Sequence, residues 1–307
     1  MFPGTLDPRI AYTRASTGTY FDSTGTMQTA AINAPRWDYD PTTLQLRGLL
    51  MEEGRTNLIL NSATLVTQSV TTTATAYTLS FYGTGTVTKS GAATGALAGT
   101  GAAQRVTQTF TPTAGSLTLT VTGSVTNGQI EAGPFATSWI PTTGATATRA
   151  IDIATMPLGS WYNASTGTFT SEHIYQGFPT LLTRTIELSD GGASNISYMA
   201  PVAASTRHDL ATVIATVSST SVTVAGAPVA NVVSKSTMAY GTNRFLCVNN
   251  GVGPLAINSA TGGFPPLVSL MHLANSANGT RPQSLWFRGI LYWGRQLTNA
   301  EITAVTT

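Results

Sequence analysis

Apolar residues alternate with hydroxyl-bearing or amide residues along three stretches in the first half of the chain. The stretches are residues 76–82, 104–110 and 116–121. Alternation with period two predicts strands that bury one face. Residues 128–133 follow as a further short strand before an aromatic stretch at 135–142. This part of the chain therefore predicts a sheet structure with one apolar face.

The second half of the chain holds further short stretches of the same kind. They lie at residues 168–175, 185–190, 209–214 and 221–225, and turn residues separate them. Many short strands with turn signals between them are typical of a β-sandwich. An aromatic-rich strand at 285–293 is expected to form an edge of this sandwich.

A helix is predicted to begin at Thr298. Thr298 can accept a hydrogen bond from the Glu301 amide, and the Glu301 side chain can reach back to the Thr298 amide. Leu297 and Ile302 occupy the two positions of a hydrophobic staple around this cap.

The composition supports an all-β chain. Charged residues make up 9% of the 307 residues, 42% are apolar, and Thr supplies more than one residue in six. Thr favours strands, and the 30 Gly favour tight turns. We expect an all-β fold with an N-terminal β-rich arm (1–61) followed by two sandwiches (62–149 and 150–307).

Two observations place these boundaries. Residues 1–61 hold the densest charge of the chain and only short strands, which favours an arm that docks on a partner or on other copies of the chain. Residues 20–27 and 161–169 share an aromatic pair, a Ser-Thr-Gly turn and a Thr. We expect both to be hairpins, and the repeat favours a new unit near residue 150.

The charge pattern argues against several partners. A net charge of +2 without a basic run gives no footprint for nucleic acid, and no stretch reaches transmembrane length. No signal peptide is recognisable, so synthesis in a cytoplasm is expected. The excess of 13 Arg over two Lys suits subunit contacts or glycan recognition, and a GC-rich genome explains it equally well.

Candidate catalytic and metal-binding groups are sparse, so we expect no enzyme, no cofactor and no metal. The three histidines are far apart, and no acidic loop forms around Asp152 or Asp190. The carboxylate pairs are better explained as structural groups, because one lies beside an Arg and the other points to opposite faces of a strand. These groups are His173, His208 and His272, and the pairs Asp38 with Asp40 and Glu52 with Glu53.

Aromatic side chains in the second sandwich are the candidates for ligand binding, because a flat ring can stack on the C–H face of a sugar. Each ring has a competing interpretation as core or subunit interface, and Trp286 and Trp139 favour the core. The glycan-binding candidates are Trp161, Tyr162, Tyr175, Tyr198 and Trp293.

Several segments resemble families of virion proteins. Residues 7–10, 13–17 and 48–58 look like the opening of bacteriophage head-spike or tail-fibre proteins. Residues 62–149 resemble carbohydrate-binding-module jelly rolls of phage virions. The strand at 285–293 and the Leu-Thr-x-Ala-Glu-Ile turn after it resemble the end of laminin-G/concanavalin-like jelly rolls. The resemblance implies two jelly rolls.

The function expected from this resemblance is that of a virion structural protein, a head spike or fibre or a tail fibre that binds host surface glycan. Its partners would be copies of itself (a trimer or higher), other virion proteins through the arm, and host polysaccharide. It would lie on the virion surface after assembly in the host cytoplasm. Two alternatives stay open: a glycan depolymerase, and a capsid decoration or tail component without a ligand.

The single cysteine, Cys247, is predicted to be buried and unreactive. It lies in the apolar stretch 244–248, and only Arg244 is close enough in sequence to stabilise a thiolate. We expect slow labelling by a thiol reagent in native buffer, whereas rapid stoichiometric labelling would contradict this prediction.

Overall fold

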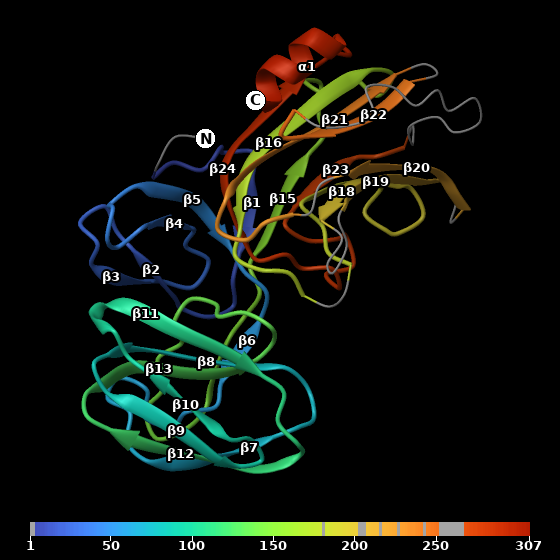
Figure 1. The fold of residues 1–307 in the computed structure, drawn as a ribbon. Coiled ribbons are helices and arrows are strands. Elements are labelled where there is room, and N and C mark those ends of the chain that lie inside the picture. Colours follow the sequence, from blue (N-terminus) through green and yellow to red (C-terminus); the bar gives the residue numbers. More distant parts are fainter. Residues whose placement is uncertain are drawn as a thin grey trace. The chain divides into compact units, whose positions relative to one another are not determined.

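The structure is a computed structural model that describes residues 4–179, 182–201, 207–214, 217–225, 228–241, 244–251 and 267–307 (Figure 1). For 207–214, 217–225 and 244–247 the backbone alone is described, so the prediction for the Cys247 thiol and the side chain of His208 lie outside the described part. The all-β prediction is confirmed, because the described residues form strands and a single short helix. None of the described helical residues forms a span that could cross a membrane.

The chain divides into two compact units, each assembled from separate segments. Unit 1 comprises Met1–Thr13, Leu46–Glu53 and Asp152–Thr307, and unit 2 comprises Arg14–Gln45 and Gly54–Ile151. The residues expected to form an arm, 1–61, are thus distributed over both units. This organisation differs from the three consecutive segments expected, because the short strands of the opening complete the cores of the two units.

Unit 2 is a β-sandwich. A four-stranded sheet in the order β10-β9-β12-β7 lies against a three-stranded sheet in the order β11-β8-β13, and two small pairs, β14-β6 and β2-β3, accompany them. The strands are β2 (Gly18–Phe21), β3 (Met27–Ala30), β4 (Arg36–Tyr39), β6 (Arg55–Asn57), β7 (Gln68–Thr72), β8 (Tyr77–Gly83), β9 (Thr86–Gly91), β10 (Gly95–Ala98), β11 (Gly101–Phe110), β12 (Gly115–Thr122), β13 (Val125–Ala132) and β14 (Ala147–Arg149).

The apolar core of unit 2 comes from the residues whose alternation predicted it. Leu79 and Phe81 of β8 pack with Leu117 and Leu119 of β12, and all four are fully buried. The polar residues next to the β12 leucines point away from this core, since Ser116 and Thr120 are exposed and Thr118 is half-buried. Period-two patterning therefore placed these strands correctly.

Unit 2 also buries four arginines, Arg14, Arg36, Arg55 and Arg149. Arg36 donates to the Thr19 carbonyl at 3.0 Å and to Ser138 Oγ at 2.9 Å. Arg149 donates to the same Ser138 Oγ at 3.1 Å. A guanidinium is stable in a protein interior only when its N–H groups are paired, so these bonds fix the loops around Ser138.

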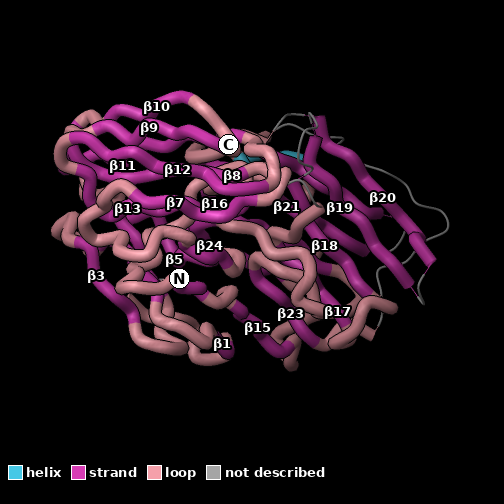
Figure 2. The backbone as a smooth tube through the Cα atoms, turned by 90° about the horizontal axis from the view of Figure 1, so that it is seen from below, coloured by secondary structure: helices cyan, strands magenta, loops and turns pink. Residues whose placement is uncertain are grey.

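Unit 1 contains two larger sheets that face each other (Figure 1). Figure 2 shows the seven-stranded sheet, in the order β1-β15-β23-β17-β18-β19-β20, while the other sheet of the unit runs β22-β21-β16-β24-β5. The elements are β1 (Ala11–Thr13), β5 (Leu46–Met51), β15 (Ile153–Pro157), β16 (Gly167–Tyr175), β17 (Ile186–Ser189), β18 (Ile196–Pro201), β19 (Arg207–Ile214), β20 (Val217–Ala225), β21 (Val233–Gly241), β22 (Arg244–Asn249), β23 (Leu270–Leu273), β24 (Leu285–Trp293) and α1 (Asn299–Thr306).

The predicted start of the terminal helix is confirmed. Thr298 is the N-cap of α1, its side chain accepts from the Glu301 amide, and the Glu301 carboxylate accepts from the Thr298 amide at 2.8 Å. Leu297 and Ile302 are buried in a small cluster with Ala239 and Val248. The helix is thus anchored on β21 and β22.

Two local predictions are wrong. The strand β24 is not an edge strand, because it lies between β16 and β5. Residues 161–169 do not form a hairpin: the stretch is a turn and bends that lead into β16, whereas 20–27 does close the β2-β3 hairpin. The short shared pattern predicts only the turn. Which strand pairs with the strand that follows depends on residues elsewhere in the fold.

A substitution at Gly48 tests how closely β5 approaches β24. Its φ is +133°, and a Cβ there would overlap the Phe287 carbonyl, whereas Gly279 in the same unit has φ +73° and open space around it. We expect Gly279→Ala to cost only the strain of a left-handed residue, about 1–2 kcal/mol. Gly48→Ala should lose about 1–3 kcal/mol more through the overlap. Equal losses in denaturant unfolding would show that β5 does not approach β24 this closely.

Candidate ligand-binding site

An aromatic cluster lies where the 159–166 loop meets β16 and β24. The Trp161 ring packs edge-on against Tyr292, with centroids 5.2 Å apart, and against Phe169 at 6.4 Å. Phe169 and Tyr292 are direct partners across the β16–β24 pairing, with centroids 4.6 Å apart. Tyr162 and Tyr240 complete the cluster behind them.

Hydrogen bonds between hydroxyls and backbone hold this cluster in place. Tyr240 donates to the Asn163 carbonyl at 2.7 Å, and the Asn163 amide donates to the Tyr292 hydroxyl at 2.8 Å. Burial raises the pKa of both Tyr162 and Tyr240 well above the ordinary value. These phenols are therefore neutral at any physiological pH, and the loop that carries Trp161 is fixed to β24.

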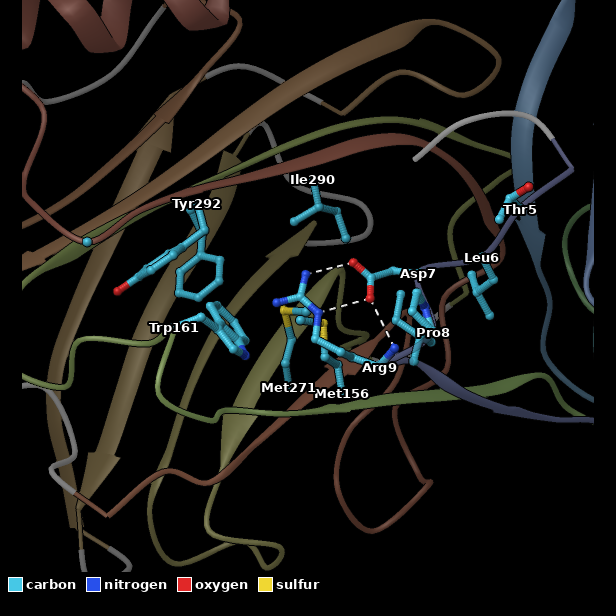
Figure 3. Close-up of a pocket in the computed structure, with 13 residues that line it drawn as sticks. Thr5, Leu6, Asp7, Pro8, Arg9, Met156, Trp161, Met271, Ile290 and Tyr292 are labelled. Carbon is cyan, nitrogen blue, oxygen red and sulfur yellow. Dashed lines mark hydrogen bonds and ion pairs between the residues drawn. The ribbon is translucent and has the colours of Figure 1, made fainter.

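A pocket of about 700 Å³ opens beside this cluster (Figure 3). Met156 of β15 and Met271 of β23 come from one sheet, and Ile290 and Tyr292 of β24 come from the other. The full lining is Thr5, Leu6, Asp7, Pro8, Arg9, Ile10, Met156, Trp161, Phe169, Met271, Ile290, Tyr292 and Gly294. The pocket is thus a gap in the sandwich of unit 1, bordered by the start of the chain.

The segment 4–10, which we call the strap, borders the pocket and is shaped by Asp7. The Asp7 carboxylate accepts from the Arg9 amide at 3.0 Å and from the Arg9 guanidinium at 2.9 and 2.7 Å. This pairing lowers the pKa of Asp7 to about 2. The Arg9 guanidinium also lies over the Trp161 ring, 5.4 Å from its centroid. Figure 3 shows the paired groups facing Tyr292 and Trp161.

Part of one edge of β24 has no strand partner among the described residues. On one side β24 pairs with β16 along its length, from Leu285 to Trp293. On the other side β5 pairs only with Leu285, Trp286 and Phe287. Among the described residues no strand pairs with this second edge from Arg288 to Trp293. In a strand, alternate backbone N–H and C=O groups point to such an edge.

The five aromatic residues predicted to bind glycan occupy different positions in the structure. Trp161 lines the pocket, and Tyr162 lies half-buried behind it in the cluster. Trp293 packs on the α1 cluster instead. The Arg184 guanidinium covers one face of Tyr198, 3.4 Å from the ring centroid.

Tyr175 is the clearest correction among the candidates. It is only 1% exposed and donates or accepts a hydrogen bond with Thr185 Oγ1 at 2.8 Å, so its ring cannot stack on a ligand at the surface. Its inward position follows from the alternation along β16. Sequence inspection of single aromatic residues does not show which face of a strand they occupy.

Several pocket residues were not predicted, above all Asp7, Arg9 and Tyr292. The Asp-Pro-Arg order of 7–9 is a turn signal, but nothing local indicates that this turn lies beside a loop 150 residues later. Tyr292 belongs to the aromatic strand that was predicted. The strict alternation of Ile290 and Tyr292 along β24 could have placed both on one face.

The groups considered for chemistry have structural partners in the described part of the chain. Asp152 accepts from the Glu52 amide at 2.8 Å and from the Tyr12 hydroxyl, and Asp190 accepts from Gly192 and Asn195 within its own turn. His272 contacts Ser189 Oγ at 2.9 Å. Within the described residues no three His, Cys, Asp or Glu side chains gather to hold a metal.

Comparisons with known proteins show only a distant likeness of fold. No family model matches the chain, and no curated protein matches it. A native heptameric SAP-like pentraxin from Limulus polyphemus is similar over 46% of this chain and 70% of its own, with 12% identity and a TM-score of 0.37. A Trypanosoma rangeli sialidase, solved with the inhibitor DANA, is similar over 50% of this chain and only 26% of its own, with 10% identity and a TM-score of 0.38. Neither likeness bears on function.

The Asp7–Arg9 pair can be tested by titration. An Arg9→Ala variant should raise the pKa of the Asp7 carboxyl from about 2 towards its ordinary value of 3.8. Because the folded pKa is the lower one, the pairing is present above pH 4 and is lost as the pH falls towards 2. Carboxyl NMR would follow both forms.

Asp22 supplies the control for this titration. Its pKa is also about 2, held by hydrogen bonds from Thr24 and Gln28 in unit 2. It should not respond to Arg9→Ala. An Asp7 pKa that is unchanged in the variant would show that Arg9 does not hold the strap.

Proposed function

We propose that this chain is a structural protein of a phage-type virion, a head spike or fibre or a tail fibre, and that unit 1 binds host surface glycan in the pocket. The virion assignment rests on the sequence motifs at 7–17, 48–58 and 285–302. The glycan assignment rests on the pocket. Copies of the chain, other virion proteins and host polysaccharide are the proposed partners, and the virion surface is the proposed location.

The observation that carries the glycan proposal is a pocket in which rings and a charged pair converge. Trp161 and Tyr292 offer apolar ring surface for the C–H groups of a sugar. The Asp7–Arg9 pair offers donors and acceptors for hydroxyls. A small-ligand site typically combines an apolar lining with a few placed polar groups.

Repetition of the chain would strengthen such binding. A single pocket open to solvent holds a sugar weakly, and linked copies can raise the overall avidity by about 10² to 10⁴ when the geometry allows. Ile32 and Leu44, in the region first expected to be an arm, are exposed apolar side chains. They are candidates for contacts with another copy or another virion protein.

A depolymerase is the second candidate, and the pocket favours it less. Glycoside hydrolysis by the common mechanism needs two carboxyl groups that flank the bond. Among the described residues that line the pocket, Asp7 is the one carboxylate, and Arg9 holds it ionised. A decoration protein without a ligand is the third candidate, and it would leave the pocket without a role.

Two tryptophans provide a matched test. We expect Trp161→Ala to weaken binding of the full chain to host cells or purified surface polysaccharide by about tenfold or more. Trp293→Ala removes an equally half-buried ring outside the pocket and should leave binding unchanged. Melting temperatures should fall in both variants, because each ring packs on neighbours.

The result that overturns the glycan proposal is equal binding by both variants and the native chain, or equal loss in both. Release of new reducing ends from the polysaccharide would establish the depolymerase instead. Immunogold labelling tests the location, and particles without label would remove the virion assignment.

A further inference from the structure

The deep part of the pocket is apolar. Met156, Met271 and Ile10 are at most 9% exposed, and they present only carbon and sulfur. Ile290, Leu6 and Phe169 continue this surface. A hydroxyl placed against these side chains would lose its hydrogen bonds to water without gaining a partner, which disfavours binding.

The mouth of the pocket is polar. The Arg9 and Asp7 side chains are 51% and 32% exposed, and Thr5 beside them is exposed. Tyr292 of β24 and Gly294 after it also line the pocket. A ligand that spans the pocket therefore meets polar groups at one end and apolar groups at the other.

The charges of the pocket cancel. Asp7 and Arg9 are the two ionisable side chains with opposite charge among its described lining residues, and they pair through two side-chain hydrogen bonds. A sugar carboxylate on the remaining N–H groups of Arg9 would lie close to the Asp7 carboxylate, and the repulsion between the two like charges would offset its attraction to Arg9. Anionic sugars thus gain no attraction from this site.

Resting on the proposed glycan function, we infer that the pocket takes a neutral sugar with a small apolar substituent, such as the methyl of an acetamido or 6-deoxy group. The substituent lies against Met156, Met271 and Ile290, and the ring hydroxyls face the strap. Specificity then comes from the depth of the pocket rather than from charge.

Matched pairs of methyl glycosides test the inference with the full chain in calorimetry. N-acetyl-D-glucosamine is compared with D-glucose, and L-fucose with L-galactose, its 6-hydroxy parent. The substituted sugar of at least one pair should bind about fourfold tighter or more, the factor given by burying one methyl-sized group. Glucuronide and galacturonide should bind no tighter than their neutral parents, and raised salt should leave the affinities unchanged.

Adjacent residues of β24 provide the variants. Ile290→Thr puts a hydroxyl into the pocket lining and should bring the two sugars of a pair to nearly equal affinity. Leu291→Thr changes the neighbouring residue, which is 56% exposed and does not line the pocket, and should keep the native preference. Thr is compatible with a strand at both positions.

The outcomes distinguish failure of this inference from failure of the proposed glycan function. Equal affinities within every pair, tighter binding of a uronide that weakens with salt, or a preference unaltered by Ile290→Thr would overturn the inference and leave glycan binding standing. No binding of any sugar, monomeric or polymeric, would overturn the proposed function and the inference with it.

Discussion

The pairing of β16 with β24 is the interaction on which the site of unit 1 depends. Its register sets Phe169 opposite Tyr292 and Thr168 opposite Trp293. Because side chains alternate across a sheet, a shift of one residue would turn Tyr292 and Ile290 away from the pocket and direct Leu291 into it. The aromatic cluster thus both depends on the register and helps to fix it, because the Tyr292 hydroxyl accepts from the Asn163 amide and shares a hydrogen bond with the Tyr240 hydroxyl.

Both units supplement an apolar core with buried arginines. Arg184 pairs with Glu187 in unit 1, and unit 2 buries Arg36 and Arg149 beside its leucines. Ser138 joins Arg36 and Arg149, and Glu131 accepts from the Thr137 amide and hydroxyl at 2.8 and 2.7 Å. Such buried polar networks are demanding, since every unpaired group costs free energy. They also select one arrangement of loops, because few others pair the same donors.

Several strands of both sandwiches were predicted from the sequence, and so was the cap of α1. Period-two alternation located β8, β12 and β16 to within a residue or two, and the capping box needs only local information. The central position of β24 and the division of residues 1–61 were not predictable in this way. They depend on which distant strand pairs with each strand edge, and no local sequence pattern indicates that pairing. Of the site, Trp161 was predicted, while Asp7 and Arg9 join it through tertiary packing alone.

The segmented construction of unit 1 has a consequence for synthesis on the ribosome. The chain crosses between the units four times, so no single cut in a crossing would release either one. Leu49, Leu50 and Met51 of β5 emerge early, yet their partners in β24 are made only near the end of the chain. These apolar side chains must stay without their native contacts while unit 2 is completed, and pairing across such a long loop is intrinsically slow. The nascent chain therefore exposes the apolar side chains of β5 for most of its synthesis. Such exposure favours aggregation until β24 is made.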